Sequence, residues 1–390
     1  MILNARCSPQ DAQWRILDAR HSMHDLAHWP TMNSEDEITT VENGKLEIEN
    51  RQSGRPRLIA FEVTRRCRFN CKHCRANAGI SGNEKELTGE QCKRILASAA
   101  GFSKPVIILT GGEAMERGDI YELIRYGRDL GLRMVMATCG YPINDESAAR
   151  LKEAGILALS ISLDGASAQI HDAFRQSVGA FDSAVKAAEA ARRAGMRFQI
   201  NTTITKSNAT ELLRIAELAE KLGAYCFNPF ILVPTGRGEE IAEEILEPGE
   251  YEKLLHNLLR IKLESAIEVR VTCGPEFARV CREAKTKKLI GSVSGCMGGR
   301  GFGFISYRGD VQTCGFLDIS AGNLIENGFD FGKIWLGSEF LKEIRNVSAY
   351  KGNCGICEYV GVCGGCRARA FTMSGDYLAA DPICNYKVKR

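Results

Sequence analysis

The chain has 390 residues, which exceeds the usual single-domain range and predicts one large domain with a smaller one. Its composition, 44% hydrophobic and 25% charged, is typical of globular proteins, and a formal net charge of +3 gives no reason to expect nucleic acid. Residues 1–30 are charged and contain no apolar segment of a signal peptide, and no stretch of about 18 apolar residues predicts a membrane span. We therefore expect a cytoplasmic protein.

The predicted elements begin after a polar, irregular N-terminal arm, residues 1–56. From Arg57 on, apolar runs of strand length alternate with amphipathic helical stretches. The predicted strands are 58–63, 106–109, 133–137, 157–163, 197–204 and 225–232. The predicted helices between them are 89–100, 118–130, 145–153, 180–194 and 208–221.

This alternation predicts an α/β fold in which a parallel sheet curls into a partial (β/α)6, TIM-like barrel over residues 57–235. Ligand sites in such sheets lie at the C-terminal ends of the strands. A mostly helical bridge, residues 236–272, is expected to connect the barrel to a cysteine-rich region, residues 273–390. Within that region, apolar stretches on both sides of Arg308-Gly309 predict a hairpin.

The 16 cysteines are concentrated in two groups, three at residues 67–74 and seven at residues 296–384. In a cytoplasmic protein, closely spaced cysteines are more often metal ligands or reactive thiols than disulfides. The first group, Cys67, Cys71 and Cys74, directly follows the first predicted strand. Three thiolates can hold three irons of a [4Fe–4S] cluster and leave the fourth open, whereas electron-transfer clusters normally have four cysteines. The alternative is a zinc site that His73 would join.

The triplet, with His73 just before its last cysteine, resembles the signature of radical S-adenosylmethionine (SAM) enzymes. Gly111-Gly112-Glu113, after the second predicted strand, resembles that family's Gly-Gly-Glu motif, although Ala114 stands where the family usually has proline. The resemblance implies that the triplet holds a catalytic, SAM-binding cluster and that His73 contributes to cofactor binding. It also implies that Gly111, Gly112 and Glu113 receive the SAM amino group, and glycines do allow close backbone approach while a carboxylate pairs with an ammonium.

Three further positions resemble the family's SAM contacts. Ser162 lies at the end of the fourth predicted strand, and Arg175 ends a His-Asp-x-x-Arg stretch suited to the SAM carboxylate. Asn201, on the fifth predicted strand, is placed to reach the ribose. Ordinary strand-end or loop hydrogen bonding is the alternative role for all three.

The C-terminal group resembles the SPASM extension of radical SAM enzymes, which houses two auxiliary [4Fe–4S] clusters. The resemblance assigns Cys354, Cys357, Cys363 and Cys384 to an outer cluster and Cys296, Cys314 and Cys366 to an inner one. Cys273 is our choice for the fourth inner ligand, with Cys281 or an open site as alternatives. In the family, three residues usually separate this pair of cysteines. In this chain only two residues, both glycines, separate Cys363 from Cys366. A zinc-ribbon lid is the competing hypothesis for this region.

Several stretches, among them residues 58–65, 199–205 and 230–238, are similar to the heme b synthases of the sirohaem-derived pathway. That similarity implies SAM and three [4Fe–4S] clusters as cofactors, a tetrapyrrole substrate and an external low-potential electron donor. The implied reaction is the oxidative decarboxylation of two propionates of Fe-coproporphyrin III to vinyl groups. Arginines suited to the substrate carboxylates are Arg237, Arg300, Arg367 and Arg369.

Three other functions fit parts of the same pattern. A sister porphyrin enzyme would remove acetate groups from didecarboxysirohaem. A SPASM peptide or cofactor maturase would share the architecture, although residues 1–56 look too short for a leader-peptide domain. A non-enzymatic iron–sulfur electron carrier would need neither an open cluster nor a Gly-Gly-Glu motif.

Overall fold

The protein is described by a computed structural model for residues 37–42, 45–50, 54–285 and 293–389. Ten strands form one sheet in the order β12-β11-β10-β3-β4-β5-β6-β7-β8-β9. The six strands at its centre are β3 (Leu58–Thr64), β4 (Val106–Gly111), β5 (Arg133–Thr138), β6 (Ile156–Ser162), β7 (Arg197–Ile204) and β8 (Cys226–Ile231). They pair in parallel, each with its neighbour in the chain. The predicted partial barrel is therefore confirmed.

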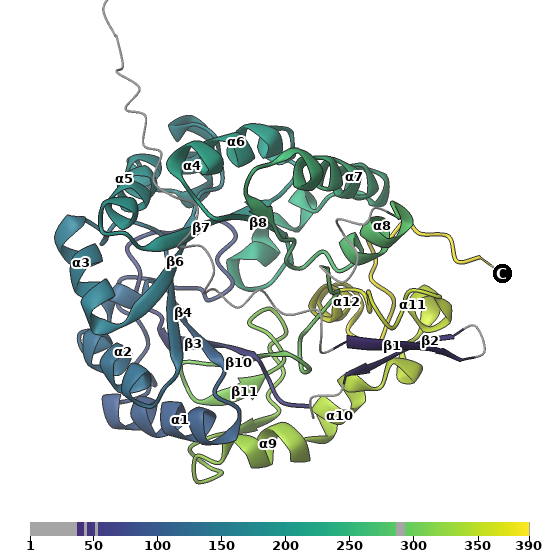
Figure 1. Ribbon diagram of the computed structural model, residues 1–390, viewed down its shortest axis with the longest axis horizontal. Coiled ribbons are helices and arrows are strands. Elements are labelled where there is room, and N and C mark those ends of the chain that lie inside the picture. Colours follow the sequence, from purple (N-terminus) through teal and green to yellow (C-terminus); the bar gives the residue numbers. More distant parts are fainter. Residues whose placement is uncertain (1–36, 43–44, 51–53, 286–292, 390) are drawn as a thin grey trace, which may run out of the picture.

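Helices cover the outer surface of this sheet, as Figure 1 shows. They are α1 (Gly89–Phe102), α2 (Ile120–Asp129), α3 (Asp145–Ala154), α4 (Ala168–Arg175), α5 (Ala180–Arg193) and α6 (Leu212–Leu222), with the short turns η2 (Ala114–Glu116) and η3 (Ala209–Glu211). The helix α4 was not predicted, because its eight residues follow β6 without a long apolar repeat. Helix α1 begins at a capping box on Thr88, and α3 ends at Gly155 with a φ of 117°.

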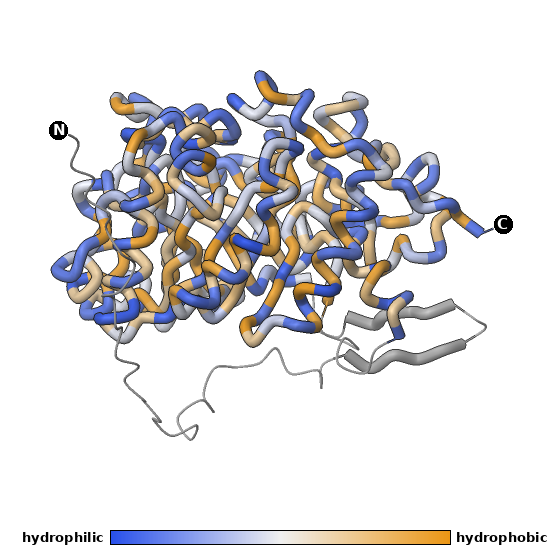
Figure 2. Tube along the Cα trace, turned by 90° about the horizontal axis from the view of Figure 1, so that it is seen from above, coloured by the Kyte–Doolittle hydropathy of each residue, from blue (hydrophilic) through white to orange (hydrophobic). Residues whose placement is uncertain are grey.

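The strands divide their side chains between a helix-covered face and the barrel interior. On β7, Phe198, Ile200 and Ile204 are buried in the core that the strands share with the helices. The alternate residues Gln199 and Asn201 are only half-buried and face the interior. The tube in Figure 2 shows apolar and polar segments interspersed through the fold. The barrel therefore has a polar interior wall suited to a ligand.

The C-terminal region completes the sheet. Strand β10 (Phe302–Ile305) forms the predicted hairpin with β11 (Asp310–Gln312), and β12 (Gly322–Asn323) follows it. In addition β10 pairs in parallel with β3, a contact across about 240 residues that no local pattern predicts. The remaining helices are α8 (Phe277–Glu283), α9 (Phe331–Gly337), α10 (Glu339–Arg345), α11 (Gly352–Ile356) and α12 (Arg367–Ser374), with the turn η6 (Val347–Ala349).

The predicted bridge and N-terminal arm have different outcomes. The bridge is mostly helical, with η4 (Gly236–Glu244) and α7 (Pro248–Glu264), and its last strand β9 (Glu268–Val269) joins the sheet beside β8. The arm was predicted to be irregular, but β1 (Glu37–Glu42) and β2 (Lys45–Asn50) form an antiparallel ribbon. The rest of the arm before Gly54 lies outside the described residues. Within the described part of the chain, no helix has the length and apolar character required to cross a membrane.

Candidate functional site

The predicted cluster loop follows β3 at the C-terminal edge of the sheet. Cys67 and Cys71 are buried and Cys74 is half-buried, and the loop closes through a bond from the Cys67 amide to the Gly79 carbonyl (3.0 Å). Arg237, which follows β8, donates from Nε to the Cys71 carbonyl and from Nη1 to the Ala78 carbonyl, both at 2.9 Å. A residue that follows β8, the last of the six central strands, therefore holds the cluster loop in place.

The glycines of the Gly-Gly-Glu motif pack directly against this loop. A Cβ added to Gly111 would lie 2.1 Å from the Thr64 carbonyl oxygen, and one added to Gly112 would lie 2.2 Å from that of Arg66. The amide of Gly112 donates to Thr64 (2.9 Å) and that of Glu113 donates to Arg66 (2.7 Å). Only glycine allows this approach, so the two motifs form one structural unit.

The Glu113 side chain is completely buried at the end of β4. Its Oε2 accepts hydrogen bonds from Thr138 Oγ1 (2.9 Å), from the Cys139 amide (2.8 Å) and from Cys139 Sγ (3.0 Å). Its Oε1 accepts one longer bond from the Met115 amide (3.3 Å). Burial raises the pKa of Glu113 above its ordinary value, and these donors oppose that rise. The carboxyl group therefore ties the end of β4 to the end of β5.

Cys139 is a site residue that the sequence did not reveal, since the pattern gave only an isolated thiol. It follows β5 directly, donates its thiol hydrogen to Glu113 Oε2, and lies beside Cys67. It belongs to the same buried cluster as Cys67, Cys71 and Ala180. Its position just after a strand, equivalent to that of Glu113 after β4, is the signal by which it could have been found.

Arg175, at the end of α4, is buried beside the cluster loop. Its side chain is 8% exposed, its Nε donates to Asp164 Oδ2 (2.6 Å), and its Nη1 lies 3.7 Å from Cys71 Sγ. Asp164 also accepts from the Thr203 amide (2.7 Å). The ring of His73 stacks on Phe174 with centroids 4.4 Å apart. Helix α4 thus supports the cluster loop through Arg175, which contacts Cys71, and through Phe174, which stacks on His73.

Ser162 and Asn201 are paired neighbours on β6 and β7. Asn201 Oδ1 accepts from Gln199 Nε2 (2.8 Å) and from Asn228 Nδ2 (3.3 Å), and Asn228 in turn accepts from Thr272 (2.9 Å). A polar row therefore crosses the interior wall near the same edge as the cluster loop. The structure brings both predicted residues to this row, and their contact with SAM stays a prediction.

A second missed element is the buried carboxylate Glu62 on β3. Its Oε1 pairs with Arg75 Nη1 (3.1 Å), and its Oε2 accepts from the Tyr307 amide (3.3 Å). Arg75 follows Cys74 directly, stacks over the Phe304 ring at 4.6 Å, and packs against Gly315. This pair joins the cluster loop to the C-terminal hairpin.

The predicted inner cysteines converge at the end of the barrel. Cys273 hydrogen-bonds Cys366, and Cys314 interacts electrostatically with both Cys296 and Cys366. The hydrogen bond from Cys273 lowers the pKa of Cys366 to about 7, whereas burial raises that of Cys314 to about 12. Cys281 lies apart on α8, where burial raises its pKa to about 11. Cys273 packs with Cys314 and Cys366, whereas Cys281 packs in the main core, so Cys273 lies with this set. That Cys273 is the fourth ligand stays a prediction.

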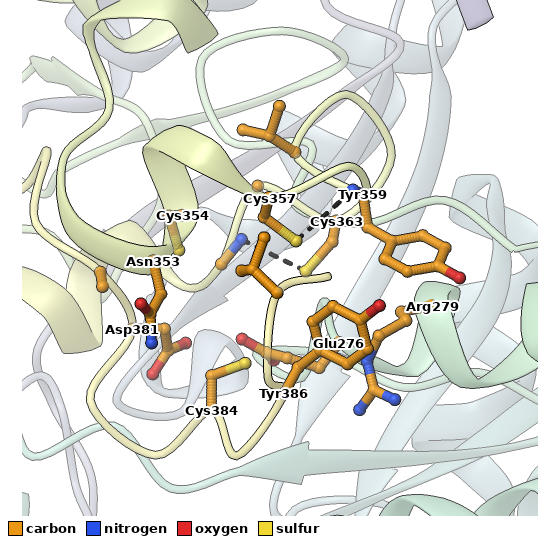
Figure 3. Close-up of a pocket in the computed structure, with 15 residues that line it drawn as sticks. Glu276, Arg279, Asn353, Cys354, Cys357, Tyr359, Cys363, Asp381, Cys384 and Tyr386 are labelled. Carbon is orange, nitrogen blue, oxygen red and sulfur yellow. Dashed lines mark hydrogen bonds between the residues drawn. The ribbon is translucent and has the colours of Figure 1, made fainter. Parts of the chain in front are cut away.

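The predicted outer cysteines line a single pocket. Figure 3 shows Cys354, Cys357, Cys363 and Cys384 around this pocket, with Glu276 and Asp381 at its wall. Gly365, with a φ of 61°, would bring an added Cβ within 3.0 Å of Cys354 Sγ. Within the described residues, no three His, Cys, Asp or Glu side chains are arranged around a single metal ion.

Two of the predicted substrate-binding arginines have other partners. Arg369 forms an ion pair with Asp381 in which both side chains are 0% exposed, and it donates to the Cys273 carbonyl (3.0 Å). Arg367 is buried and donates to the Ala379 carbonyl (2.6 Å). The prediction that these two meet the substrate is therefore wrong, because neither guanidinium is accessible. Asp381 also accepts from the Cys366 amide (2.7 Å), so the ion pair holds the inner cysteines.

Comparison with known proteins agrees with this site. A family model described as "Radical SAM superfamily" matches residues 61–219, which span β3 to α6 and contain the triplet and the Gly-Gly-Glu motif. Relatives matching most of the chain support the same assignment. The chain belongs to the radical SAM superfamily and is an enzyme.

Two curated relatives show which kinds of radical SAM enzyme the chain is similar to. The chain is 43% identical to a protein of Methanosarcina barkeri named "AdoMet-dependent heme synthase", over 85% of this chain and 97% of that protein. It is 32% identical to the "Fe-coproporphyrin III synthase" of the same organism, over 84% of this chain and 87% of that protein. Among solved structures, Streptococcus suis SuiB bound to its precursor peptide SuiA has a TM-score of 0.69 at 17% identity, covering 85% of this chain and 76% of SuiB. At this low identity, the similarity to SuiB shows that the two proteins share a fold.

Proposed function

We propose that the chain is a radical SAM heme synthase that converts two propionates of Fe-coproporphyrin III to vinyl groups and so forms heme b. The observation that carries this proposal is the 43% identity to a heme synthase across nearly that protein's whole length. The site supports it, since the cysteine triplet and the Gly-Gly-Glu motif form one unit at the ligand-binding edge of the barrel.

The residues present fit a [4Fe–4S] cluster with one open iron. Three cysteines lie in one loop, Arg175 provides a cation beside Cys71, and glycines leave space where side chains would collide. When bound, the cluster and SAM supply a radical that removes a hydrogen atom from a propionate side chain. Gly111, Gly112 and Glu113 would receive the SAM amino group, and Ser162 and Asn201 would contact its ribose or carboxylate.

The rest of the wall would orient SAM and keep water away. The row of Asn201, Asn228 and Thr272 is already hydrogen-bonded within itself, so its donors and acceptors are fixed before a ligand arrives. Enclosure of this kind prevents side reactions of a reactive species. His73 would contribute by packing, since its ring covers Phe174 behind the loop.

The eight remaining site cysteines would hold two auxiliary clusters, which makes three [4Fe–4S] clusters in total. The inner set is Cys273, Cys296, Cys314 and Cys366, and the outer set is Cys354, Cys357, Cys363 and Cys384. Loss of carbon dioxide from each propionate radical leaves a vinyl group and one electron, which these clusters would accept. The partners would be the tetrapyrrole and an external low-potential electron donor. We place the protein in the cytoplasm, where thiols stay reduced.

Anaerobic reconstitution with SAM, dithionite and Fe-coproporphyrin III, followed by mass spectrometry, tests the proposal. We expect 5′-deoxyadenosine, carbon dioxide and a product that has lost two carboxyl groups. Formation of 5′-deoxyadenosine without porphyrin decarboxylation would reject the heme synthase and retain the radical SAM class. Loss of acetate groups from didecarboxysirohaem would instead identify the sister porphyrin activity, and modification of a peptide would identify a maturase.

A further inference from the structure

The loop cysteine Cys71 has a charged side-chain neighbour that comes from a different part of the barrel. Arg175, at the end of α4, places Nη1 at 3.7 Å from Cys71 Sγ. Arg175 is not part of the loop itself, and its side chain is almost completely enclosed. Water therefore has little access to this contact.

A carboxylate holds this neighbour in place. Asp164 Oδ2 accepts a hydrogen bond from Nε of Arg175 at 2.6 Å, and Asp164 Oδ1 accepts one from the Thr203 amide at 2.7 Å. Arg175 is thus oriented toward Cys71 before any cofactor arrives.

We propose that Arg175 is a positioning residue that donates a hydrogen bond to the sulfur of Cys71 and thereby raises the reduction potential of the cluster. The inference rests on the proposed function, in which Cys67, Cys71 and Cys74 hold that cluster. An added electron makes the cluster more negative, and donors to its sulfurs stabilise that state. A higher potential makes the cluster easier to load from an external donor.

The donor is a strong one, because a guanidinium carries a full positive charge. This role differs from the SAM-carboxylate contact that the family resemblance implies for Arg175, because Nε and Nη1 already face Asp164 and Cys71.

The test is a redox titration of the reconstituted holoenzyme, followed by electron paramagnetic resonance, without SAM and without porphyrin. Arg175→Lys keeps the charge beside Asp164 but loses the forked reach to Cys71, and the midpoint of the triplet cluster shifts to a lower potential. Arg175→Gln also loses the charge and shifts the midpoint further in the same direction. The auxiliary clusters keep their midpoints in both variants.

Cys226→Ala is the matched control. Cys226 is a buried thiol at the start of β8, the end of the strand away from the cluster loop, and it donates a hydrogen bond to the Phe227 carbonyl. Its removal leaves the triplet cluster's midpoint unchanged. An unchanged midpoint in both Arg175 variants overturns the proposal. Equal shifts of all clusters also overturn it, since the effect would then be global. Loss of the triplet cluster's iron from both Arg175 variants overturns it too, because the contact would then hold the loop together and not tune the cluster.

This measurement separates the proposal from the proposed function. It uses neither SAM nor substrate, so a wrong substrate assignment leaves its outcome intact. Failure of the heme synthase proposal appears instead in the product analysis of the unaltered enzyme, as absent decarboxylation of Fe-coproporphyrin III.

Discussion

The two cysteine regions of this protein are held together in different ways. Cys67, Cys71 and Cys74 lie within eight residues, and backbone bonds to Gly112 and Glu113 fix their loop. The C-terminal set extends from Cys273 to Cys384 and meets around a fully buried ion pair, Arg369–Asp381. The first region is a local motif placed by a regular sheet edge. The second is an assembly whose members are distant in the chain, so it depends on long-range side-chain contacts.

Loss of a triplet cysteine separates the two regions most sharply. Cys71→Ala removes a ligand from the local motif and is expected to abolish formation of 5′-deoxyadenosine from SAM. The auxiliary iron–sulfur signals are expected to persist, because their cysteines lie elsewhere. Anaerobic product analysis together with iron quantification measures both outcomes, and continued SAM cleavage by this variant would contradict the assignment of the triplet.

Breaking the buried ion pair is the corresponding test of the C-terminal region. Arg369→Leu leaves the Asp381 carboxylate buried without its partner and is expected to lower the free energy of unfolding by about 3–5 kcal/mol. Arg193→Ala removes a pair with Asp145 in which both side chains are more than half exposed, and solvent screening makes its effect much smaller. Denaturant titration compares the two, and equal effects would show that the buried pair does not hold this region.

Crowding the junction of the two barrel motifs has a smaller effect. Gly112→Ala brings a Cβ within 2.2 Å of the Arg66 carbonyl and is expected to destabilise the protein by about 2–3 kcal/mol and to weaken cluster loading. Gly101→Ala, on α1 where nothing lies within 4 Å, is the control and is expected to be neutral or slightly stabilising. Normal iron content in Gly112→Ala would mean that the loop tolerates displacement.

Acidification probes the support of the cluster loop. Burial lowers the pKa of His171 to about 4, and its Nδ1 accepts the Asp164 amide. The unfolded chain binds this proton near pH 6.5 while the folded chain does not, so stability falls as the pH decreases below 6.5. Between pH 6.5 and 5 the loss attributable to His171 is about 1.5 kcal/mol. His171→Asn is expected to show a shallower dependence in denaturant titrations, and an identical slope would contradict the neutral, buried imidazole.

The sequence predicted the barrel strands well because each one is a compact apolar run between amphipathic helices. Strands β3 to β8 begin and end within about two residues of their predicted bounds. It did not predict α4, which is short, or the ribbon of β1 and β2. The parallel pairing of β10 with β3 was also missed, since it depends on contact between distant segments.

The candidate site shows the same contrast between local patterns, which could be predicted, and contacts between distant segments, which could not. The triplet and the Gly-Gly-Glu motif were readable from spacing, because their residues act together within a few positions. Cys139 was not, since a single cysteine acquires its role only when β5 places it beside Glu113. Arg369 appeared to be a substrate contact because its charge is visible in the sequence and its partner Asp381 is not adjacent.

The sequence by itself indicated the class of chemistry, since the cysteine spacing after the first strand and the Gly-Gly-Glu motif after the second resemble the radical SAM pattern and are local enough to be visible in it. It also determined the order of strands and helices, which hydrophobic periodicity encodes directly. Only the tertiary structure decided which charges are free and which are bound, and that Cys273 rather than Cys281 lies with the inner cysteines. Burial and partnership depend on what the rest of the chain brings to each residue, and spacing along the chain carries no information about that.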